Sequence, residues 1–375
     1  MKSKILLLIV TIAFIFGCKD EFDETTFNGI LSKSFQLDNI DNISFTNDNG
    51  LLISGSAGEK YTLIKTDENL KIEWKKNNYE WGNLIYGSGL VQSIYSFQIN
   101  KVFQQNNGQY ICIGTIQEGT DMVWSSTLII ILNQDGNQIQ KFRFDDMYVS
   151  NVIRTNDEGY ILFGYGMTIK LDKNFNLQWE KNFKDNKYSP IQIVSTSNSG
   201  FAITGTYNAS HQVYLKTYGS EGNELLSKTY KHDEHPSLEG GNDIVQLLDD
   251  GFLIVGRAGR TLPQITDCQV IRTNEVGDTI WTKRFEHRTY SWFDQIIFNE
   301  SNNFVFEGTI GFPNEIQESF LMKINSNGEV LDSLTVSKFE MIVNSPLNYY
   351  IKATKENSDH IKLTMIDSDN LFKKE

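Results

Sequence analysis

The stretch NDEGYILFG at residues 156–164 begins the clearest copy of a phrase that recurs through this chain. The copy continues with Lys170-Leu171-Asp172 and ends with WEKNF at residues 179–183. Apolar runs separated by Asn/Asp-Gly turns are typical of short antiparallel strands. The phrase occurs six times and once more in a degenerate form. Because repetition at a period of roughly 40–50 residues indicates a solenoid or propeller, we predict an all-β fold, a seven-bladed β-propeller of four-stranded blades.

Each repeat is predicted to contribute four strands whose positions are marked by glycine and tryptophan. In the first repeat, strands near residues 43–46, 51–54 and 62–66 precede a fourth strand that carries Trp74. A glycine in the second strand indicates a crowded position where two backbones approach closely. Trp74 recurs as Trp179 and Trp281, and this periodicity predicts packing between blades rather than a unique binding site. The second-strand glycines are Gly55, Gly114, Gly164, Gly205, Gly256 and Gly308, with Ala353 in the seventh repeat.

The two ends of the propeller are predicted to meet in one blade. The seventh repeat, at about residues 341–375, has three recognisable strands and a weak fourth. Residues 32–35 (SKSF) resemble the fourth-strand segment SKTY at residues 227–230. We therefore predict that residues 31–37 supply the outer strand of the last blade, which leaves no exposed sheet edge at the seam.

Residues 1–17 are predicted to be a signal peptide rather than part of the fold. Lys2 and Lys4 precede an apolar run that is too short to span a membrane. The run ends in Gly17-Cys18, which resembles the lipobox of bacterial lipoproteins. An ordinary signal peptide followed by an incidental cysteine is the alternative. The resemblance implies that Cys18 is the lipidation site and carries fatty acyl chains such as palmitate.

The residues behind this cysteine are acidic. The sequence KDEFDE at residues 19–24 resembles the export signal of surface lipoproteins from Bacteroidetes-type bacteria. The resemblance implies a lipid-anchored protein of the outer membrane, exposed at the cell surface. Polar, acidic residues with few apolar anchors are typical of flexible chain. We therefore expect a flexible acidic tether over residues 18–29 and the propeller over residues 30–375.

Composition limits the partners of this protein. The formal net charge is −13, and loss of Lys2 and Lys4 with the leader would make it about −15. A nucleic-acid partner, which needs a basic surface, is therefore not expected. Cys112 and Cys268 fall in different repeats, so we expect neither a disulfide nor a cysteine metal site.

The pattern Lys-x-Asp-x-x-Gly-x-x-x-Trp resembles the repeats of quinoprotein-like and WD40-like propellers. It is seen best from Lys170 to Trp179 and from Thr273 to Trp281. The resemblance covers nearly the whole mature chain and implies the fold, not a cofactor. Quinone-binding enzymes of this kind often carry vicinal cysteines, which this chain lacks, so no cofactor is expected. The Asp-box of sialidases also ends in tryptophan but has a closer spacing between its aspartate and its tryptophan.

One face of the predicted ring is the candidate ligand-binding face. The turns that join the first strand to the second and the third to the fourth are uniformly short. The connections at the opposite face, here termed the elaborated face, are long and varied. Binding residues commonly lie on loops that a rigid scaffold positions, so we predict that the elaborated face holds the ligand. Its long connections are residues 77–100, 116–126, 231–242, 257–267, 286–292 and 309–319.

These connections contain aromatic and arginine residues outside the repeat pattern. Aromatic faces stack on sugar rings or anchor protein partners, and arginine binds carboxylate or sulfate groups. Alternatively, the aromatic residues pack the loops onto the propeller, and the arginines pair with acids such as Asp267 or Glu286. The candidate binding residues are Trp81, Tyr86, Trp124, Arg257, Arg260, Arg288, Tyr290 and Trp292.

Catalytic and metal-binding signals are weak. The cluster HDEH at residues 232–235 has metal-ligand character, but its position in a loop favours a solvated segment over a metal site. We find no nucleophile elbow or Ser-His-Asp spacing, so no catalytic residue is assigned. Paired carboxylates from different blades stay open as an alternative, with Glu118, Asp121, Glu239 and Glu315 on the elaborated face.

The sequence therefore favours a surface lipoprotein that binds a glycan or a protein partner through its elaborated face and performs no chemistry. The membrane is a further partner, through the lipid anchor. The first alternative is a carbohydrate-active lyase or hydrolase, with Tyr290 and His287 as its first candidate residues. The second alternative is a structural subunit of an outer-membrane protein complex.

Overall fold

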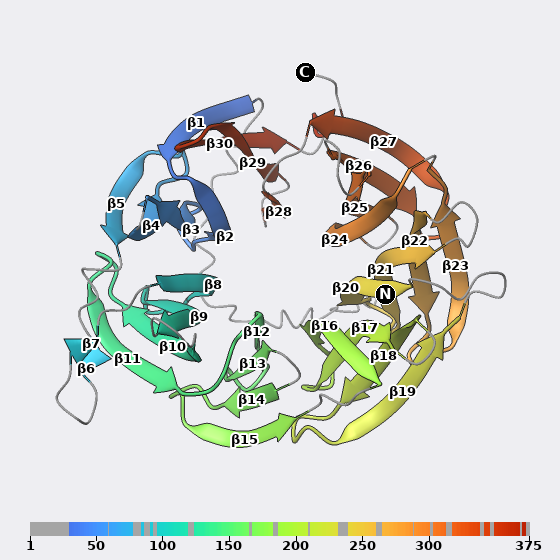
Figure 1. The fold of residues 1–375 in the computed structure, drawn as a ribbon, viewed down its shortest axis with the longest axis horizontal. Helices are drawn as coiled ribbons and strands as arrows, with labels where there is room; N and C mark the ends of the chain where they lie inside the picture. The colour runs from blue at the N-terminus through green and yellow to red at the C-terminus, as the bar shows by residue number, and fades with distance from the viewer. Residues whose placement is uncertain are drawn as a thin grey trace, which may run out of the picture.

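The computed structural model is a ring of seven four-stranded antiparallel sheets, which confirms the predicted seven-bladed β-propeller (Figure 1). In each blade the first strand lies nearest the centre of the ring and the fourth lies at the rim. The described residues form strands and turns, and none of them belongs to a helix that could cross a membrane. The structure describes residues 30–58, 60–77, 84–85, 91–92, 96–118, 124–164, 167–182, 187–208, 211–231, 239–259, 265–287, 289–300, 303–312, 317–337, 341–345, 349–367 and 370–372.

The blades follow one another along the chain, and a two-stranded hairpin lies between blades 1 and 2. The strands are β2 (Asn39–Phe45), β3 (Leu51–Ala57), β4 (Lys60–Thr66) and β5 (Ile72–Asn77) in blade 1; β6 (Leu84–Ile85) and β7 (Val91–Gln92) in the hairpin; β8 (Ser96–Gln104), β9 (Tyr110–Glu118), β10 (Trp124–Leu132) and β11 (Gln138–Phe144) in blade 2; β12 (Asn151–Arg154), β13 (Tyr160–Gly164), β14 (Met167–Leu171) and β15 (Leu177–Asn182) in blade 3; β16 (Tyr188–Ser195), β17 (Phe201–Tyr207), β18 (Gln212–Tyr218) and β19 (Glu224–Tyr230) in blade 4; β20 (Gly240–Gln246), β21 (Phe252–Gly259), β22 (Thr266–Thr273) and β23 (Thr279–Phe285) in blade 5; β24 (Ser291–Glu300), β25 (Asn303–Ile310), β26 (Glu318–Asn325) and β27 (Val330–Ser337) in blade 6; and β28 (Met341–Asn344), β29 (Tyr349–Asn357), β30 (His360–Asp367) and β1 (Ile30–Gln36) in blade 7.

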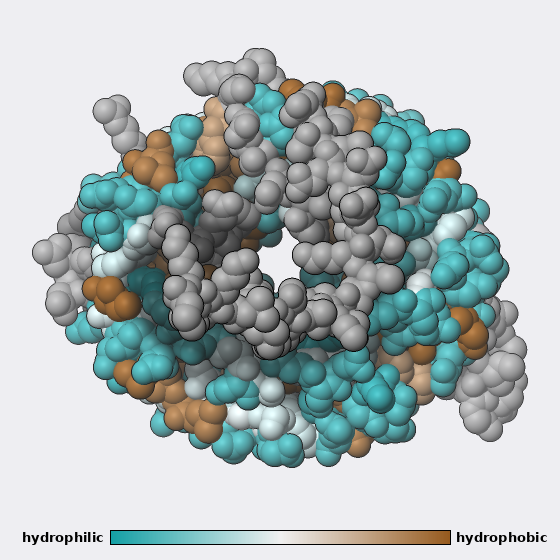
Figure 2. Space-filling view, turned by 180° about the vertical axis from the view of Figure 1, so that it is seen from behind, coloured by the Kyte–Doolittle hydropathy of each residue, from teal (hydrophilic) through white to brown (hydrophobic). Residues whose placement is uncertain are grey.

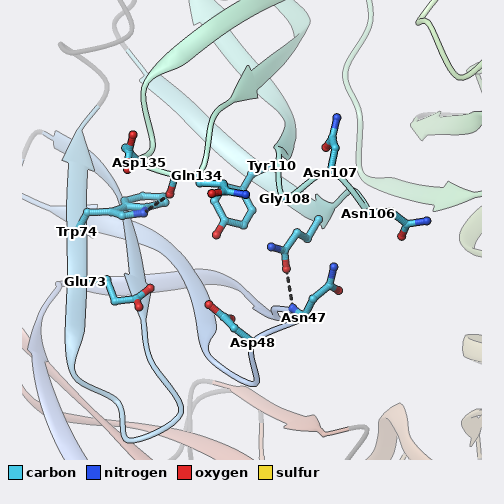
Figure 3. Close-up of a pocket in the computed structure, with 11 residues that line it drawn as sticks. Asn47, Asp48, Glu73, Trp74, Asn106, Asn107, Gly108, Tyr110, Gln134 and Asp135 are labelled. Atoms are coloured by element: carbon cyan, nitrogen blue, oxygen red, sulfur yellow. Dashed lines mark hydrogen bonds between the residues drawn. The ribbon is translucent and has the colours of Figure 1, made fainter. Parts of the chain in front are cut away.

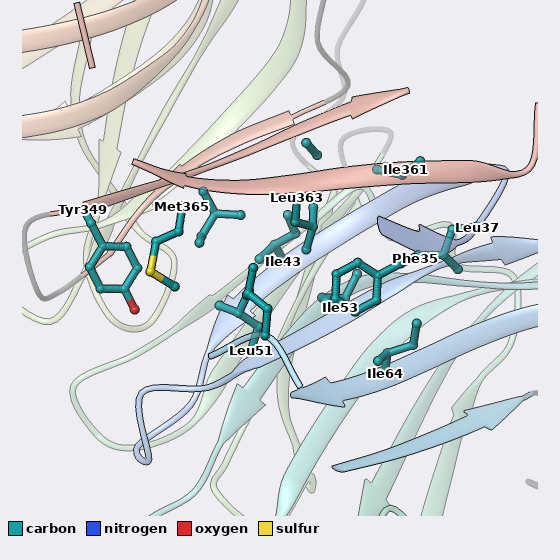
Figure 4. Packing of buried hydrophobic residues seen from close by; sticks show 13 residues of the cluster. Phe35, Leu37, Ile43, Leu51, Ile53, Ile64, Tyr349, Ile361, Leu363 and Met365 are labelled. Carbon is teal, nitrogen blue, oxygen red and sulfur yellow. The ribbon is translucent and has the colours of Figure 1, made fainter. Parts of the chain in front are cut away.

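The ring is closed by the N-terminal strand, as predicted. Strand β1 pairs antiparallel with β30, from Ile30 opposite Ile366 to Gln36 opposite His360. The side chain of Phe35 is buried between blades 7 and 1 in an apolar cluster (Figure 4). The first and last described strands of the chain therefore share one sheet, and the last blade gains its outer strand from the opposite end of the sequence.

The apolar core is divided among the interfaces between blades. Each of seven clusters of buried side chains among the described residues joins one face of a blade to the facing side of its neighbour. Between blades 5 and 6, for example, Val255 and Val270 pack with Phe293 and Phe306. Central strands are buried on both faces, which explains their nearly continuous apolar runs. On the face shown in Figure 2, the coloured residues are mainly hydrophilic, with scattered hydrophobic ones.

In blades 1, 2, 4, 5 and 6 the second-strand glycine lies opposite a bulge in the innermost strand. In blade 3, β12 and β13 pair without a register shift, and Gly164 approaches the backbone of Tyr148. In blade 2, Ile99 pairs with Gly114 and Lys101 pairs with Ile113, so Asn100 is the extra residue. A Cβ atom on Gly114 would lie 2.1 Å from the carbonyl oxygen of Gln98. Strand β28 pairs with β29 without such a register shift, and there Ala353 replaces the glycine. Close backbone approach therefore explains the repeated glycine that the sequence shows.

The short turns are held by a buried cation beneath them. In blade 3 the Lys170 Nζ lies 2.8 Å from an Asp157 carboxylate oxygen, and the Gly159 N–H donates to Asp157 at 3.2 Å. A Cβ on Gly159 would meet Lys170 Nζ at 2.4 Å, so glycine makes room for the ammonium group. Lys65 with Asp48 in blade 1 and Arg272 with Asp249 in blade 5 repeat this pair. The lysine of the Lys-x-Asp phrase therefore stabilises the turns and has a structural role.

The repeated tryptophans join neighbouring blades, as predicted from their periodicity. The indole N–H of Trp74 donates to the backbone oxygen of Gln134 in the next blade, at 2.8 Å. Trp179 and Trp281 make the same bond to Ser220 and Ser326, at 2.9 and 3.0 Å. Each outer strand thereby covers a turn of the following blade.

Candidate functional site

The two faces of the ring differ in the regularity of their connections. On one face, here termed the turn face, the turns repeat the same pair of backbone hydrogen bonds. In blade 3, Thr155 N donates to Gly159 O at 2.9 Å and Glu158 N donates to Thr155 O at 2.9 Å. At the elaborated face, the spacing between strands varies widely. It runs from two residues between Ala57 and Lys60 in blade 1 to seven residues between Ile310 and Glu318 in blade 6.

Strands reach further into the predicted connections than the sequence indicates. The connection between β9 and β10 comprises residues 119–123 rather than 116–126, because both strands continue to pair up to Glu118 and Trp124. Likewise β25 ends at Ile310 and β26 begins at Glu318, which shortens the predicted connection over residues 309–319. Polar residues at these strand ends, such as Gln117, Glu118, Ser125 and Ser126, are not typical of strands, and for this reason the sequence did not indicate the full strand lengths.

The structure describes part of the predicted ligand-binding set. Arg257 is in β21, Tyr290 immediately precedes β24, and Trp292 is the second residue of β24. Trp124 begins β10, with its backbone opposite Glu118. The other predicted residues, Cys18, Trp81, Tyr86, Arg260 and Arg288, lie outside the described residues. The HDEH cluster at residues 232–235 and the carboxylates Asp121 and Glu315 also lie outside them.

Trp292 and Tyr290 occupy fixed positions at the mouth of blade 6. The Trp292 Nε1 donates to a carboxylate oxygen of Asp294 at 2.7 Å. The Thr309 hydroxyl donates to the other oxygen of Asp294 at 2.7 Å. The ring of Tyr290 packs edge-on against Phe312, with 5.9 Å between ring centroids. These contacts orient both aromatic residues, and each of them stays partly accessible.

Arg257 and Asp267 do not form the ion pair that the sequence left open. Arg257 is exposed in β21, opposite Cys268 of β22. Asp267, considered above as a partner for the candidate arginines, is fully buried and pairs with Arg284 at 2.9 Å. Sequence reasoning did not identify Arg284 because it lies in the repeated fourth strand. Arg257 is therefore not the partner of Asp267 and presents its guanidinium to solvent.

The two residues suggested for catalysis pack on separate aromatic rings. His287 lies on Phe320, with ring centroids 5.4 Å apart, whereas Tyr290 lies on Phe312. Burial lowers the pKa of the His287 imidazole, and the charge of Asp267 offsets part of this effect. No hydrogen bond joins His287 to Tyr290 within the described part of the chain. The structure therefore does not bring them together as an acid–base pair.

A belt of polar side chains follows the bulges around the central opening seen in Figure 2. The Gln192 Nε2 donates to Asp243 at 3.0 Å, and Asp243 also accepts the backbone N–H of Ile296 at 2.8 Å. Burial raises the pKa of Asp243 and lowers that of Lys101, and their mutual attraction offsets part of both shifts. Burial likewise raises the pKa of Asp41 to about 6. The belt links blades 4, 5 and 6 by internal bonds, which is a structural role.

A pocket of about 700 Å³ opens on the turn face between blades 1 and 2 (Figure 3). We term it the turn-face pocket. Two aromatic residues from adjacent blades line it, Trp74 and Tyr110, with ring centroids 5.9 Å apart. The remaining lining residues are polar or glycine: Asn47, Asp48, Glu73, Gln104, Asn106, Asn107, Gly108, Gln134 and Asp135.

A buried lysine fixes the carboxylates of this pocket. The Nζ of Lys65, which is 1% exposed, lies 2.8 Å from Asp48 and 2.8 Å from Glu73. Burial alone would raise the pKa of Asp48, but hydrogen bonds from Lys65 and Thr46 lower it below its usual value. Burial raises the pKa of Tyr110 to about 12, with a further contribution from the negative charges of Asp48 and Glu73. The lowered pKa of Asp48 favours its carboxylate form, and the raised pKa of Tyr110 favours its protonated phenol.

Sequence reasoning did not select the turn-face pocket. Trp74 was assigned to packing, which is correct, and Tyr110 and Glu73 lie within repeated strands. The signal was a departure from the repeat at Glu73, whose place beside the tryptophan is taken by Gln178 and Ile280 in blades 3 and 5. Such a departure is visible only when the strands are aligned by their register.

No protein-family model and no curated protein matches this chain. Among solved structures it is similar to a protein of unknown function from Bacteroides caccae, with 10% identity and a TM-score of 0.40 over 66% of this chain and 81% of that one. A member of the DUF4221 family from Bacteroides vulgatus has 9% identity and a TM-score of 0.41 over 74% and 94%. A eukaryotic initiation factor has 10% identity and a TM-score of 0.42 over 85% and 82%. These similarities are too distant to assign a function.

Proposed function

We propose that this protein is a lipid-anchored protein of the outer membrane, exposed at the cell surface, whose propeller binds a glycan through the elaborated face without catalysing a reaction. The observation that carries the proposal is the contrast between the two faces. One face repeats a single turn geometry, while the other varies from blade to blade around a rigid ring. Loops on a rigid scaffold are common places for binding residues.

The side chains of the elaborated face suit a glycan. Trp292 is oriented by its bond to Asp294, and Tyr290 is oriented by Phe312. Aromatic faces that are fixed before binding lose little conformational freedom when a sugar ring stacks on them. Arg257 is exposed and is able to bind a carboxylate or sulfate group by a bidentate contact. An acidic polysaccharide combines these two kinds of group.

The path of the chain supports an anchor on the far side from the ligand. Ile30 pairs with Ile366, next to the end of β30 and beside the turns of blade 7. The chain therefore joins the propeller at the turn face. An acyl chain on Cys18 would hold the turn face toward the membrane and present the elaborated face outward.

Replacing Arg257 and Trp292 together by alanine is expected to weaken binding of an acidic polysaccharide by about tenfold or more, because central aromatic and arginine residues dominate binding energies. Affinity electrophoresis of the full-length protein in detergent, through gels cast with pectate, alginate or chondroitin sulfate, measures this effect. The matched control is Lys173→Ala with Leu177→Ala, which removes one cation and one exposed apolar side chain from the turn-face side.

Retardation of the wild type that persists unchanged in the Arg257→Ala/Trp292→Ala variant would place the glycan elsewhere. Absence of retardation in every gel would favour a protein partner, which crosslinking on intact cells followed by affinity purification would reveal.

Replacing Cys18 by serine is expected to remove the anchor and release most of the protein from the membrane fraction, since serine offers no thiol for acylation. Cell fractionation and labelling with a radioactive or alkyne-tagged fatty acid test this. Replacement of Cys112, which is fully buried in β9, is not expected to change the label. Equal fatty-acid labelling of the wild type and the Cys18→Ser variant would contradict the proposal.

A further inference from the structure

The turn-face pocket departs from the repeat that surrounds it. The equivalent place between blades 5 and 6 is lined by Ile280, Trp281 and Phe304 and encloses about 350 Å³. There the tryptophan is flanked by an aliphatic residue and packs near a phenylalanine. Between blades 1 and 2 the same tryptophan position is flanked by Glu73 and faces Tyr110. Asp249 and Arg272 also line the place between blades 5 and 6, so what distinguishes the turn-face pocket is Glu73 beside the tryptophan and the hydroxyl of Tyr110.

Tyr110 is a buried residue whose hydroxyl lacks a partner within the described part of the chain. Its side chain belongs to a residue that is 3% exposed. Tyrosines at the same position of other blades do have partners: Tyr160 bonds to the side chain of Gln105 and Tyr349 bonds to that of Ser345. Figure 3 shows the Tyr110 hydroxyl directed into the space between Glu73 and Asp48. This hydroxyl is reached from the pocket, so it is able to donate to or accept from a group that binds there.

The charge of the pocket excludes an anionic ligand. Three carboxylates, Asp48, Glu73 and Asp135, line it, and the ammonium group of Lys65 is shared by Asp48 and Glu73. An anion would meet uncompensated negative charge. The ligand is therefore neutral or cationic.

The amide groups favour a neutral ligand that carries hydroxyl groups. Five carboxamide side chains line the pocket, and each offers both a donor and an acceptor. A hydroxyl group also donates and accepts, so it can use both ends of an amide, whereas a cation needs acceptors only. Carboxylates that are held in place, such as Glu73 against Lys65, accept strongly from sugar hydroxyls. The volume of about 700 Å³ falls in the range of small-molecule sites.

We propose that the turn-face pocket binds one neutral sugar unit of a glycan, with its ring against Trp74 and its hydroxyls bonded to Glu73, Tyr110 and the surrounding amides. The site is separate from the elaborated face, lies on the opposite side of the ring, and prefers an uncharged ligand. A protein with both sites would hold two glycan segments at once, which raises the overall affinity through effective concentration.

The test uses substitutions to residues that already occur at the same repeat positions in other blades. Tyr110→Phe creates the residue found at the same position as Phe201 and Phe304, and Glu73→Gln creates the residue found beside Trp179 as Gln178. The packing of the interface is therefore expected to survive, which thermal unfolding checks. Both changes are introduced into the full-length Arg257→Ala/Trp292→Ala protein in detergent, so that the elaborated face does not contribute.

We expect at least one neutral polysaccharide among glucan, mannan, xylan and galactan to retard the Arg257→Ala/Trp292→Ala protein during affinity electrophoresis. Adding Tyr110→Phe and Glu73→Gln is expected to weaken that retardation about tenfold or more, since hydrogen bonds to a fixed carboxylate and a buried hydroxyl are lost. Adding Tyr349→Phe instead, at the same repeat position of blade 7, is expected to leave it unchanged.

The proposal is overturned if no neutral polysaccharide retards the Arg257→Ala/Trp292→Ala protein, or if Tyr110→Phe with Glu73→Gln leaves the retardation unchanged. It is also overturned if polylysine, but no neutral glycan, binds the Arg257→Ala/Trp292→Ala protein and this binding is lost on adding Tyr110→Phe and Glu73→Gln. That result would assign a cationic ligand to the pocket. Because the elaborated face is disabled throughout, each result is independent of the function proposed for that face.

Discussion

Replacing Phe35 by alanine is expected to lower the free energy of unfolding by about 3–5 kcal/mol, the usual cost of removing a buried aromatic side chain. Phe35 is 2% exposed and fills the seam between blades 7 and 1 together with Leu363 and Ile53. The loss therefore acts on the contact that closes the ring. Chemical denaturation of the purified protein measures the change.

The matched control for this prediction is the neighbouring residue of the same strand. Gln36 is exposed, and Gln36→Ala is expected to change the free energy of unfolding by less than about 0.5 kcal/mol. A loss for Phe35→Ala no larger than for Gln36→Ala would mean that strand β1 is not part of the cooperative core.

Replacing Gly114 by alanine is expected to destabilise the protein by about 3 kcal/mol, although it adds a single methyl group. That methyl would lie 2.1 Å from the carbonyl oxygen of Gln98, so the bulge at Asn100 must move. The comparison is Ala353→Gly in blade 7, whose strands pair without this shift, where the expected cost is about 1 kcal/mol.

Thermal and chemical denaturation of both variants test the explanation of the repeated glycines. If Gly114→Ala is no more damaging than Ala353→Gly, close backbone approach does not explain why glycine recurs there. A crystal structure of Gly114→Ala with an unchanged bulge would lead to the same conclusion.

The ring was predictable from sequence because its determinants recur. The second-strand glycine recurs in six repeats and the fourth-strand tryptophan in three. Together with the Lys-x-Asp phrase, they mark local geometries that comparison of the repeats reveals. The closure was predictable for the same reason, since residues 32–35 match an outer strand that the seventh repeat lacks. The bulges themselves were not predictable, because a glycine indicates close approach without saying which backbone approaches it.

The sites were less predictable because they depend on pairs from different strands and blades. Trp292 was a candidate from the sequence, whereas its bond to Asp294 was not predictable, because Asp294 is the extra residue of a bulge in β24. Tyr110, Tyr160 and Tyr349 are alike in sequence position, and only their surroundings distinguish them. Tyr160 meets Gln105 from the preceding blade, whereas Tyr110 meets the open space beside Glu73.

The pairing of β1 with β30 also sets the order in which the molecule can be completed. Strand β1 is synthesised before any other strand of the ring, and its partner β30 is synthesised after all of them. Contacts that span nearly the whole chain form slowly, since the intervening segment must first become ordered. Six blades can assemble from segments that are close in sequence. Phe35 can be buried only after residues more than 300 positions away, such as Leu363, have been synthesised. A chain interrupted before β30 would keep two unpaired strand edges, which favour aggregation. Closure by the first strand thus makes completion of the last one a condition for a soluble ring.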